Sequence, residues 1–224
     1  MAPTESMQMA VEAMSAILDK HGIHHAVIGG FAVQLLGHTR ATSDIDFEID
    51  VGKVSELRGR VSQLLIESDA RFSLEHFKLF FTPSQLPQLR VPMEMLPIGE
   101  LGLPTQLQVI RPGNGLVPIL RPGILILTKI KRCATLIDST RPKSLTKFRF
   151  DVSDIEFLLK WLVNNDEKVD FAGYQSRAVH RLYAAAGELL KHWKETGQEE
   201  LVQLMDSVLE EDDREKIKVE IKVE

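Results

Sequence analysis

The strongest chemical signal in the sequence is a pair of aspartates, Asp44 and Asp46, that follows a pair of glycines, Gly29 and Gly30. The aspartates lie in the run SDIDFEID, in which acidic and apolar residues alternate. Because successive side chains of a strand point to opposite faces, this run predicts a strand with carboxylates on one face and core residues on the other. Converging carboxylates are the hard oxygen ligands that Mg²⁺ uses. We therefore expect metal-dependent phosphate chemistry at this strand.

The glycine pair separates a short apolar run, residues 26 to 28, from an apolar helical segment, residues 31 to 36. Glycine allows unusual backbone angles and lets a ligand approach bare N–H groups, and the positive end of the following helix faces the same place. The spacing fits neither the GxGxxG fingerprint nor the GxxxxGK[ST] loop, so neither a Rossmann cofactor nor a P-loop ATPase is indicated. We expect a strand, a phosphate-binding turn and a helix.

Further charged residues flank the two aspartates. Arg40 lies four residues before Asp44, close enough for its guanidinium to reach a phosphate that the metal also holds, and an ordinary surface arginine is the alternative. Glu48 and Asp50 lie farther along the strand from the glycine turn. We expect these two carboxylates to support the metal ligands or to be solvated.

A resemblance to the nucleotidyltransferase superfamily rests on Gly29-Gly30-Phe31-Ala32, Gly37, Arg40, Thr42 and Asp44-Ile45-Asp46-Phe47. This superfamily includes polymerase beta, the lincosamide and aminoglycoside adenylyltransferases, and the small AbiEii-type and minimal nucleotidyltransferases of toxin-antitoxin systems. The resemblance is tight over residues 23 to 51. It implies that the two aspartates and a third carboxylate from a later strand hold two Mg²⁺ ions, and that the glycine turn contacts the triphosphate.

The third carboxylate is expected to be Glu94, which interrupts the apolar strand of residues 90 to 96. Burying an unpaired carboxylate is costly, so Glu94 needs a charged partner, a metal or water. By analogy with the superfamily, which usually has aspartate there, Glu94 takes the third position; a solvent-facing strand residue is the alternative, and Glu75 is the reserve candidate. The expected catalytic and metal-binding residues are Asp44, Asp46 and Glu94.

A basic segment runs from residue 129 to residue 149, with seven basic residues and one acidic residue. It is either a solvated surface or a wall that neutralises triphosphate charge. The order of a lysine-bearing helix, a basic loop and then residues 151 to 155 is similar to AbiEii-like members, which implies a nucleotide contact for Lys129. The residues expected to bind nucleotide are Gly29, Gly30, Arg40, Ser43 and Lys129.

Composition limits the class of protein. The chain has 224 residues, a net charge of −5 and one cysteine, and it contains no apolar run of about 18 residues. We expect a soluble, cytoplasmic protein that binds neither membranes nor long nucleic acids non-specifically. The histidines at positions 21, 24 and 25 are expected to be solvated turn residues, and Cys133 a small buried or half-buried residue on a helix.

The expected fold class is α+β, with a small mixed β-sheet core covered by helices in residues 1 to 120 and an α-helical region in residues 121 to 224. Apolar periodicity predicts helices near residues 5–20, 53–66, 124–137, 153–163, 174–194 and 198–211. Alternation predicts strands over residues 71–82 and 90–96. The C-terminal run IKVEIKVE also alternates, and its alternatives are an edge strand, a strand that pairs with another chain, and disorder.

These features together predict transfer of a nucleoside monophosphate from an NTP, with ATP expected, to a hydroxyl on a small molecule, a protein or an RNA end, with release of pyrophosphate. The expected cofactor is Mg²⁺, with Mn²⁺ as the alternative. Two other classes stay open: a catalytically inactive nucleotide-binding or partner-binding module of the same fold, and a glycosyltransferase that holds a sugar nucleotide through Asp44 and Asp46. The acceptor and the oligomeric state are not readable from the sequence.

Overall fold

The structure is a computed structural model that describes residues 3–176 and 179–222. The chain divides into two compact units, Met1–Leu120 and Arg121–Glu224. Each unit has its own apolar core and is described by itself.

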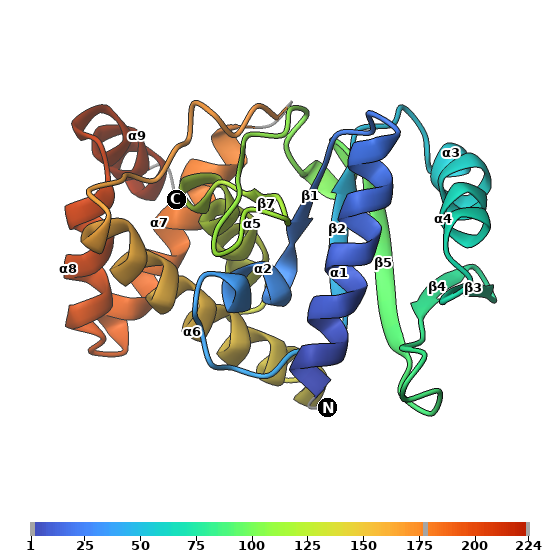
Figure 1. The fold of residues 1–224 in the computed structure, drawn as a ribbon. Coiled ribbons are helices and arrows are strands. Elements are labelled where there is room, and N and C mark those ends of the chain that lie inside the picture. Colours follow the sequence, from blue (N-terminus) through green and yellow to red (C-terminus); the bar gives the residue numbers. More distant parts are fainter. Residues whose placement is uncertain (1–2, 177–178, 223–224) are drawn as a thin grey trace. The chain divides into compact units, whose positions relative to one another are not determined.

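The first unit is built on a seven-stranded mixed sheet in the order β3-β4-β5-β2-β1-β7-β6 (Figure 1). β2 pairs in parallel with β5 and antiparallel with β1, and β1 pairs in parallel with β7. The strand that carries the acidic run therefore lies at the centre of the sheet. The strands are β1 (His25–Ile28), β2 (Ile45–Ile49), β3 (Phe72–Glu75), β4 (Lys78–Phe81), β5 (Val91–Pro97), β6 (Val109–Ile110) and β7 (Ile119–Leu120).

Alternation along β2 places its apolar side chains in the core, as predicted. Ile45, Phe47 and Ile49 are fully buried. Glu48 is also fully buried, so the solvated alternative for this residue was wrong, and support of the metal ligands stays a prediction. Asp50, directly after the strand, is exposed.

Helices cover the sheet of the first unit. α1 (Pro3–Lys20) lies against the sheet (Figure 1). Its buried side chains include Met7, Val11, Met14 and Leu18, at the helical spacing that predicted the helix. The other helical segments are α2 (Gly29–Leu35), α3 (Val54–Glu56), the π-helical turn η1 (Leu57–Val61), α4 (Ser62–Ser68) and the 3₁₀ turn η2 (Glu100–Gly102).

Two predicted elements of this unit are interrupted. The run of residues 71 to 82 is not one strand but the hairpin of β3 and β4, because His76 and Phe77 adopt positive φ angles at its turn. Phe77, whose alternation suggested a core position, is consequently 76% exposed. The helix predicted over residues 53 to 66 contains the π-helical turn Leu57–Val61, and Val54, predicted on its apolar face, is 38% exposed at the start of the helix.

Among the described residues of the second unit, all regular secondary structure is helical. It consists of α5 (Pro122–Ala134), α6 (Pro142–Asn164), α7 (His180–Glu195), α8 (Glu199–Val208) and α9 (Glu211–Lys222). Tyr174 and Trp193 are among its largest fully buried side chains. Cys133 lies buried on α5, as expected, and burial raises the pKa of its thiol to about 12.

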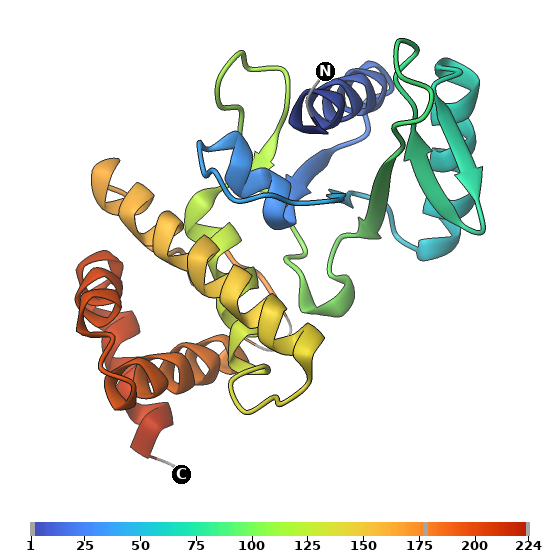
Figure 2. The ribbon, with the colours of Figure 1, turned by 90° about the horizontal axis from the view of Figure 1, so that it is seen from below.

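Three boundaries in this unit differ from the predictions. α6 begins at Pro142, so the predicted basic loop is in fact the first half of a long helix (Figure 2). α7 begins later than expected, at His180. The C-terminal run is neither an edge strand nor disordered as far as Lys222, because it continues α9 with Ile217 buried; residues 223 and 224 lie outside the described residues.

The architecture confirms the predicted fold class, with a mixed sheet core followed by a helical C-terminal region. Among the described residues, no helix combines the length and apolar character needed to cross a membrane.

Candidate active site at the β1–α2 turn

The turn between β1 and α2 is shaped around the carboxylate of Asp46. Gly29 follows the last residue of β1 and has φ +70°, a left-handed conformation that side chains other than glycine adopt at a cost. A Cβ atom added to Gly29 would overlap the Asp46 carboxylate, and its distance to Asp46 Cγ would be only 2.9 Å. Asp46 lies opposite Ile28 in the β1–β2 pairing. Because Gly29 follows Ile28, this register places the Asp46 carboxylate at the turn. Glycine at position 29 is therefore required by both backbone angle and space.

The second glycine makes room for a cation. A Cβ atom on Gly30 would meet the guanidinium of Arg40 and lie 3.0 Å from the hydroxyl of Thr42. Arg40 Nη1 donates a hydrogen bond of 2.9 Å to the carbonyl of Ala41, and Gln34 Nε2 on α2 donates to the carbonyl of Arg40. These contacts hold the loop after α2 so that a guanidinium lies over the turn, where the first backbone N–H groups of α2 have no intrahelical acceptor.

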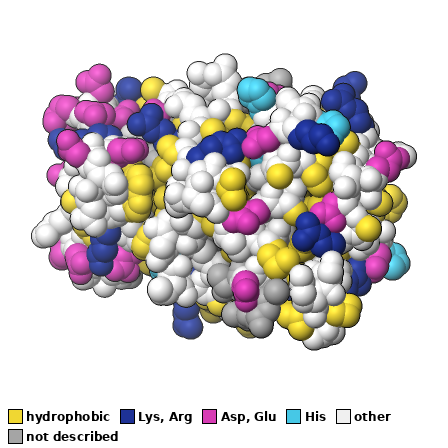
Figure 3. All heavy atoms as spheres, in the orientation of Figure 1, with side chains coloured by type: hydrophobic (Ala, Val, Ile, Leu, Met, Phe, Trp, Pro, Cys, Tyr) yellow, Lys and Arg dark blue, Asp and Glu magenta, His cyan; other side chains and the backbone are white. Residues whose placement is uncertain are grey.

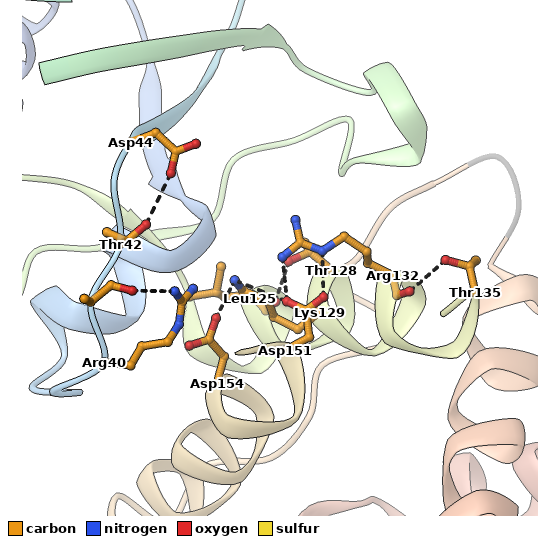
Figure 4. A network of polar contacts seen from close by, with 11 residues as sticks. Arg40, Thr42, Asp44, Leu125, Thr128, Lys129, Arg132, Thr135, Asp151 and Asp154 are labelled. Atoms are coloured by element: carbon orange, nitrogen blue, oxygen red, sulfur yellow. Dashed lines mark hydrogen bonds and ion pairs between the residues drawn. The ribbon is translucent and has the colours of Figure 1, made fainter. Parts of the chain in front are cut away.

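Thr42 also contacts the first of the two aspartates, Asp44. Its hydroxyl donates to Asp44 Oδ1 over 3.2 Å (Figure 4). Asp44 is exposed and directly precedes β2, whereas Asp46 is half-buried within it. Sequence reasoning did not assign contacts to Thr42 or Gln34; a threonine two residues before an aspartate is a local hydrogen-bonding pattern that could have indicated the first.

Glu94 lies beside Asp46. The two residues are directly paired in the parallel β2–β5 register, so their side chains emerge on the same face from strands about 4.8 Å apart. Glu94 is exposed. The reserve candidate, Glu75, forms an ion pair of 2.7 Å with Arg90.

The carboxylates of Asp44, Asp46 and Glu94 are of the chemical type that binds Mg²⁺, but they do not surround a common point. Within the described residues, no three His, Cys, Asp or Glu side chains are grouped closely enough to hold a metal ion. Mg²⁺, however, is usually bound through one or two carboxylates together with substrate phosphates and water. Asp46 and Glu94, with Asp44 two residues before Asp46, carry carboxylate oxygens of that type.

The remaining predicted nucleotide ligands are Ser43 and Lys129. Ser43 is exposed in the loop before β2. Lys129 lies on α5 in the second unit, where its side chain is 2% exposed. Its Nζ atom donates to Asp154 over 2.7 Å and lies 3.8 Å from Asp151 (Figure 4).

Lys129 belongs to a buried ionic network on α5 and α6. Asp151 and Asp154 are both fully buried, and Arg132 donates from two nitrogens to Asp151. Burial lowers the pKa of Lys129, and the attraction of Asp154 and Asp151 opposes that effect. These contacts give Lys129 a structural role; the predicted nucleotide contact stays a prediction.

One of the histidines expected in a solvated turn is instead a core residue. His25 begins β1 and is 4% exposed. Its Nδ1 atom lies 2.9 Å from the carbonyl of Ile23, to which it donates, and its Nε2 atom is buried with no hydrogen-bond partner among the described residues. Burial lowers the pKa of His25, which favours the neutral ring.

Comparison with known proteins supports the fold. No protein-family model matches the chain, and a search of curated proteins finds no match. Among solved structures, the crystal structure of an antigenic nucleotidyltransferase-like protein from Paracoccidioides brasiliensis is similar, with a TM-score of 0.64 and 18% sequence identity. The similarity covers 89% of this chain and 93% of that chain. The protein therefore has a nucleotidyltransferase-like fold.

Proposed function

We propose that the protein is a metal-dependent nucleotidyltransferase that moves a nucleoside monophosphate from an NTP to a hydroxyl acceptor and releases pyrophosphate. The observation that carries the proposal is the packing of the Asp46 carboxylate against Gly29, with the Arg40 guanidinium over Gly30. A carboxylate, bare backbone N–H groups and a cation thus lie at one turn. This combination suits a triphosphate accompanied by a divalent ion.

Each residue of the turn has a distinct part in the proposed reaction. Asp44, Asp46 and Glu94 would hold Mg²⁺, with Mn²⁺ as an alternative. The bound ions would act as Lewis acids that lower the pKa of the acceptor hydroxyl and stabilise the leaving pyrophosphate. Thr42 fixes the orientation of the Asp44 carboxylate through its hydrogen bond.

The backbone and Arg40 would bind the phosphates. Gly29 and Gly30 have no Cβ atom, and the Asp46 carboxylate and the Arg40 guanidinium occupy the space beside them, so a phosphate bound at this turn would contact the guanidinium together with the backbone N–H groups. The planar guanidinium of Arg40 can donate two parallel hydrogen bonds to a phosphate and neutralise charge that develops during the transfer. Ser43 and Lys129 are proposed as additional nucleotide contacts only.

The proposed donor is an NTP, with ATP first, and the proposed location is the cytoplasm, in keeping with the single, buried cysteine. The acceptor is a hydroxyl on a small molecule, a protein or an RNA end.

A second candidate is a nucleotide-binding module of the same fold that lacks catalysis. It is favoured by the finding that the carboxylates of the described residues do not form a three-ligand cluster. Such a module would bind an NTP with a metal but release no pyrophosphate.

The test is a thermal-shift screen of the four NTPs with and without Mg²⁺, followed by measurement of pyrophosphate release. The variant is Asp46→Asn, which keeps the size of the side chain against Gly29, and the matched control is Asp50→Asn, an exposed carboxylate just after the same strand.

We expect Mg²⁺-dependent stabilisation of wild type and of the control. In Asp46→Asn, we expect loss of that stabilisation and a fall in pyrophosphate release of about 100-fold or more. Binding without pyrophosphate release would select the second candidate. Stabilisation that is equal in wild type and Asp46→Asn would refute both.

A further inference from the structure

The two faces of the sheet differ where it is formed by β3, β4 and β5. On the core face, Leu79 and Phe81 of β4 are buried. On the opposite face, which we call the outer face, Lys78 is exposed and Phe80 is half-buried, as is Pro92 on the neighbouring strand β5. Because residues two positions apart on a strand share a face, Lys78 and Phe80 lie on the same side of the sheet.

The strand register places Lys78 in one row with the carboxylates of the candidate site. Asp46 on β2 pairs with Ile28 on β1 and with Glu94 on β5. Lys78 on β4 comes opposite Glu94, one position beyond the last paired residues of these two strands. The row therefore runs across the outer face from the glycine turn, through the two carboxylates, to the ammonium group of Lys78.

Lys78 has acidic neighbours in this row but pairs with neither. Within the residues that the structure describes, its side chain forms no hydrogen bond or ion pair, although Glu75 lies opposite it on β3 and Glu94 on β5. Glu75 is instead paired with Arg90 over 2.7 Å. Lys78 is therefore available to an anion that binds beside the carboxylates.

A planar cation lies on the same face. Arg90 directly precedes β5, and its Cζ atom lies 4.2 Å from the centroid of the Phe80 ring, within the range of a cation–π contact. The contact with Phe80 and the ion pair with Glu75 hold the guanidinium in place, while the Arg90 side chain is 38% exposed. Nucleobases stack on aromatic rings and on guanidinium planes. Arg90 and Phe80 thus form a stacking surface beside Lys78.

Charge and stacking together indicate the kind of ligand. On β3 and β4 the charged side chains are Glu75 and Lys78, and because Glu75 pairs with Arg90, one positive charge remains beside the metal carboxylates. On the side of the first unit that Figure 3 shows, basic and acidic side chains are interspersed instead. One available ammonium group next to one stacking surface fits a single nucleotide, with its phosphate on the first and its base on the second.

The row also gives this surface a place in the proposed reaction. In phosphoryl transfer the attacking and leaving oxygens lie roughly in line, on opposite sides of the transferred group. The glycine turn, where the leaving pyrophosphate would be held, is at the β1 end of the row, and Lys78 is beyond the carboxylates at the β4 end. The acceptor would therefore approach over β5 and β4.

We infer that the outer face of β4 binds a single nucleotide and that this nucleotide is the hydroxyl acceptor of the transfer. Lys78 contacts its phosphate, and Arg90, held against Phe80, stacks on its base. A ribose hydroxyl oxygen forms a bond to the α-phosphorus of the NTP, the bond from that phosphorus to pyrophosphate breaks, and the hydroxyl proton passes to water. The inference rests on the proposed function, which leaves the acceptor open.

The test is a transfer assay on the full chain with ATP radiolabelled at the α-phosphate, Mg²⁺ and AMP, in which the labelled dinucleotide is separated by thin-layer chromatography. Adenosine, which lacks the phosphate, is the comparison acceptor. The variants are Lys78→Gln and Phe80→Leu. Their matched controls are Lys53→Gln, at an exposed lysine of the same unit, and Phe77→Leu, at an exposed ring in the turn of the β3–β4 hairpin.

Wild type should transfer label to AMP. Lys78→Gln should raise the KM for AMP about tenfold, because a charge-assisted hydrogen bond to the phosphate is lost, and should leave the KM for ATP and for adenosine unchanged. Phe80→Leu should raise the KM for both acceptors at least about fivefold, because base stacking is weakened. Both controls should behave as wild type. A structural role of Lys78 would instead affect AMP and adenosine alike.

Thermal stabilisation by ATP and Mg²⁺ separates the two proposals. If ATP stabilises wild type but not Asp46→Asn, and AMP receives no label, the nucleotide site at Asp46 stands and this inference fails. If ATP and Mg²⁺ do not stabilise wild type, both fail.

Three further results would overturn the inference. The first is a wild-type KM for AMP in Lys78→Gln, with its melting temperature unchanged. The second is competition between AMP and ATP, since AMP would then occupy the donor site. The third is labelling of an aminoglycoside or of a short RNA in preference to AMP.

Discussion

At the scale of single residues, the candidate site depends on the absence of side chains as much as on their presence. Gly29 leaves room for the Asp46 carboxylate, and Gly30 leaves room for the Arg40 guanidinium. A negative and a positive group therefore reach the same turn from different parts of the first unit.

Gly29→Ala tests this packing directly, and Gly22→Ala is its matched control. Both glycines have positive φ, but a Cβ atom on Gly22 would meet nothing within 4 Å. Each variant should lose about 1–2 kcal/mol of stability from backbone strain, measured by urea unfolding. Only Gly29→Ala should also lose stabilisation by NTP and Mg²⁺ in a thermal-shift measurement, because its methyl group displaces Asp46.

If Gly29→Ala kept the full nucleotide response, the position of Asp46 against the turn would not matter for binding. An equal loss of response in Gly22→Ala would attribute the effect to general destabilisation.

At the scale of elements, α5 and α6 are joined by an ionic network in which one lysine and two aspartates are buried. Lys129 lies between two fully buried carboxylates, and Arg132 covers one of them from the surface. Removing one member of such a network leaves the other charges unpaired in a medium where they are poorly solvated.

Lys129→Met should therefore destabilise the second unit by about 3–5 kcal/mol. The control is Lys160→Met, which removes the cation of an exposed ion pair with Glu156 and should change stability far less, because water solvates the remaining carboxylate. Both tryptophans, Trp161 and Trp193, lie in this unit, so tryptophan fluorescence during urea unfolding measures the effect.

The same variant separates two roles of Lys129. Normal stability together with loss of the nucleotide response would assign Lys129 to the nucleotide, as the sequence analysis expected. A loss of stability with the nucleotide response retained would assign it to the ionic network alone.

At the scale of the whole molecule, the stability of the first unit should depend on pH through His25. Burial is the main cause that lowers the pKa of this residue from its ordinary value of 6.5. Below pH 6.5 the unfolded chain binds a proton that the folded chain does not. The stability that His25 contributes is therefore complete above pH 6.5 and falls at about 1.4 kcal/mol per pH unit below it, until the folded-state pKa is reached.

Hydrogen exchange of the β1 and β2 amides, corrected for intrinsic rates, measures this dependence. His25→Asn is the comparison, since its side-chain amide can still donate to Ile23 but does not titrate. In His25→Asn, the free energy of unfolding should not show the fall below pH 6.5 that protonation of His25 causes in wild type. If wild type and variant lost stability in parallel, other groups would be responsible.

Much of the architecture was determined locally by the sequence. The alternation in SDIDFEID predicted a central strand, because its apolar residues have only one face on which to be buried. The spacing of Met7, Val11 and Met14 predicted α1 for the same reason at a helical period. The glycine pair before an apolar helical segment predicted the turn that the structure shows at Gly29.

What only the tertiary structure decided are the pairings between residues distant in sequence. The β2–β5 register places Glu94 beside Asp46, and no local pattern specifies a register between strands so far apart in the chain. The packing of α5 against α6 places Lys129 beside the buried Asp154 and Asp151, and Val54, at the start of its helix, is 38% exposed. Local periodicity fixes which face of an element is apolar, but the partner of a charge depends on which faces meet, and that is decided by the packing of the whole unit.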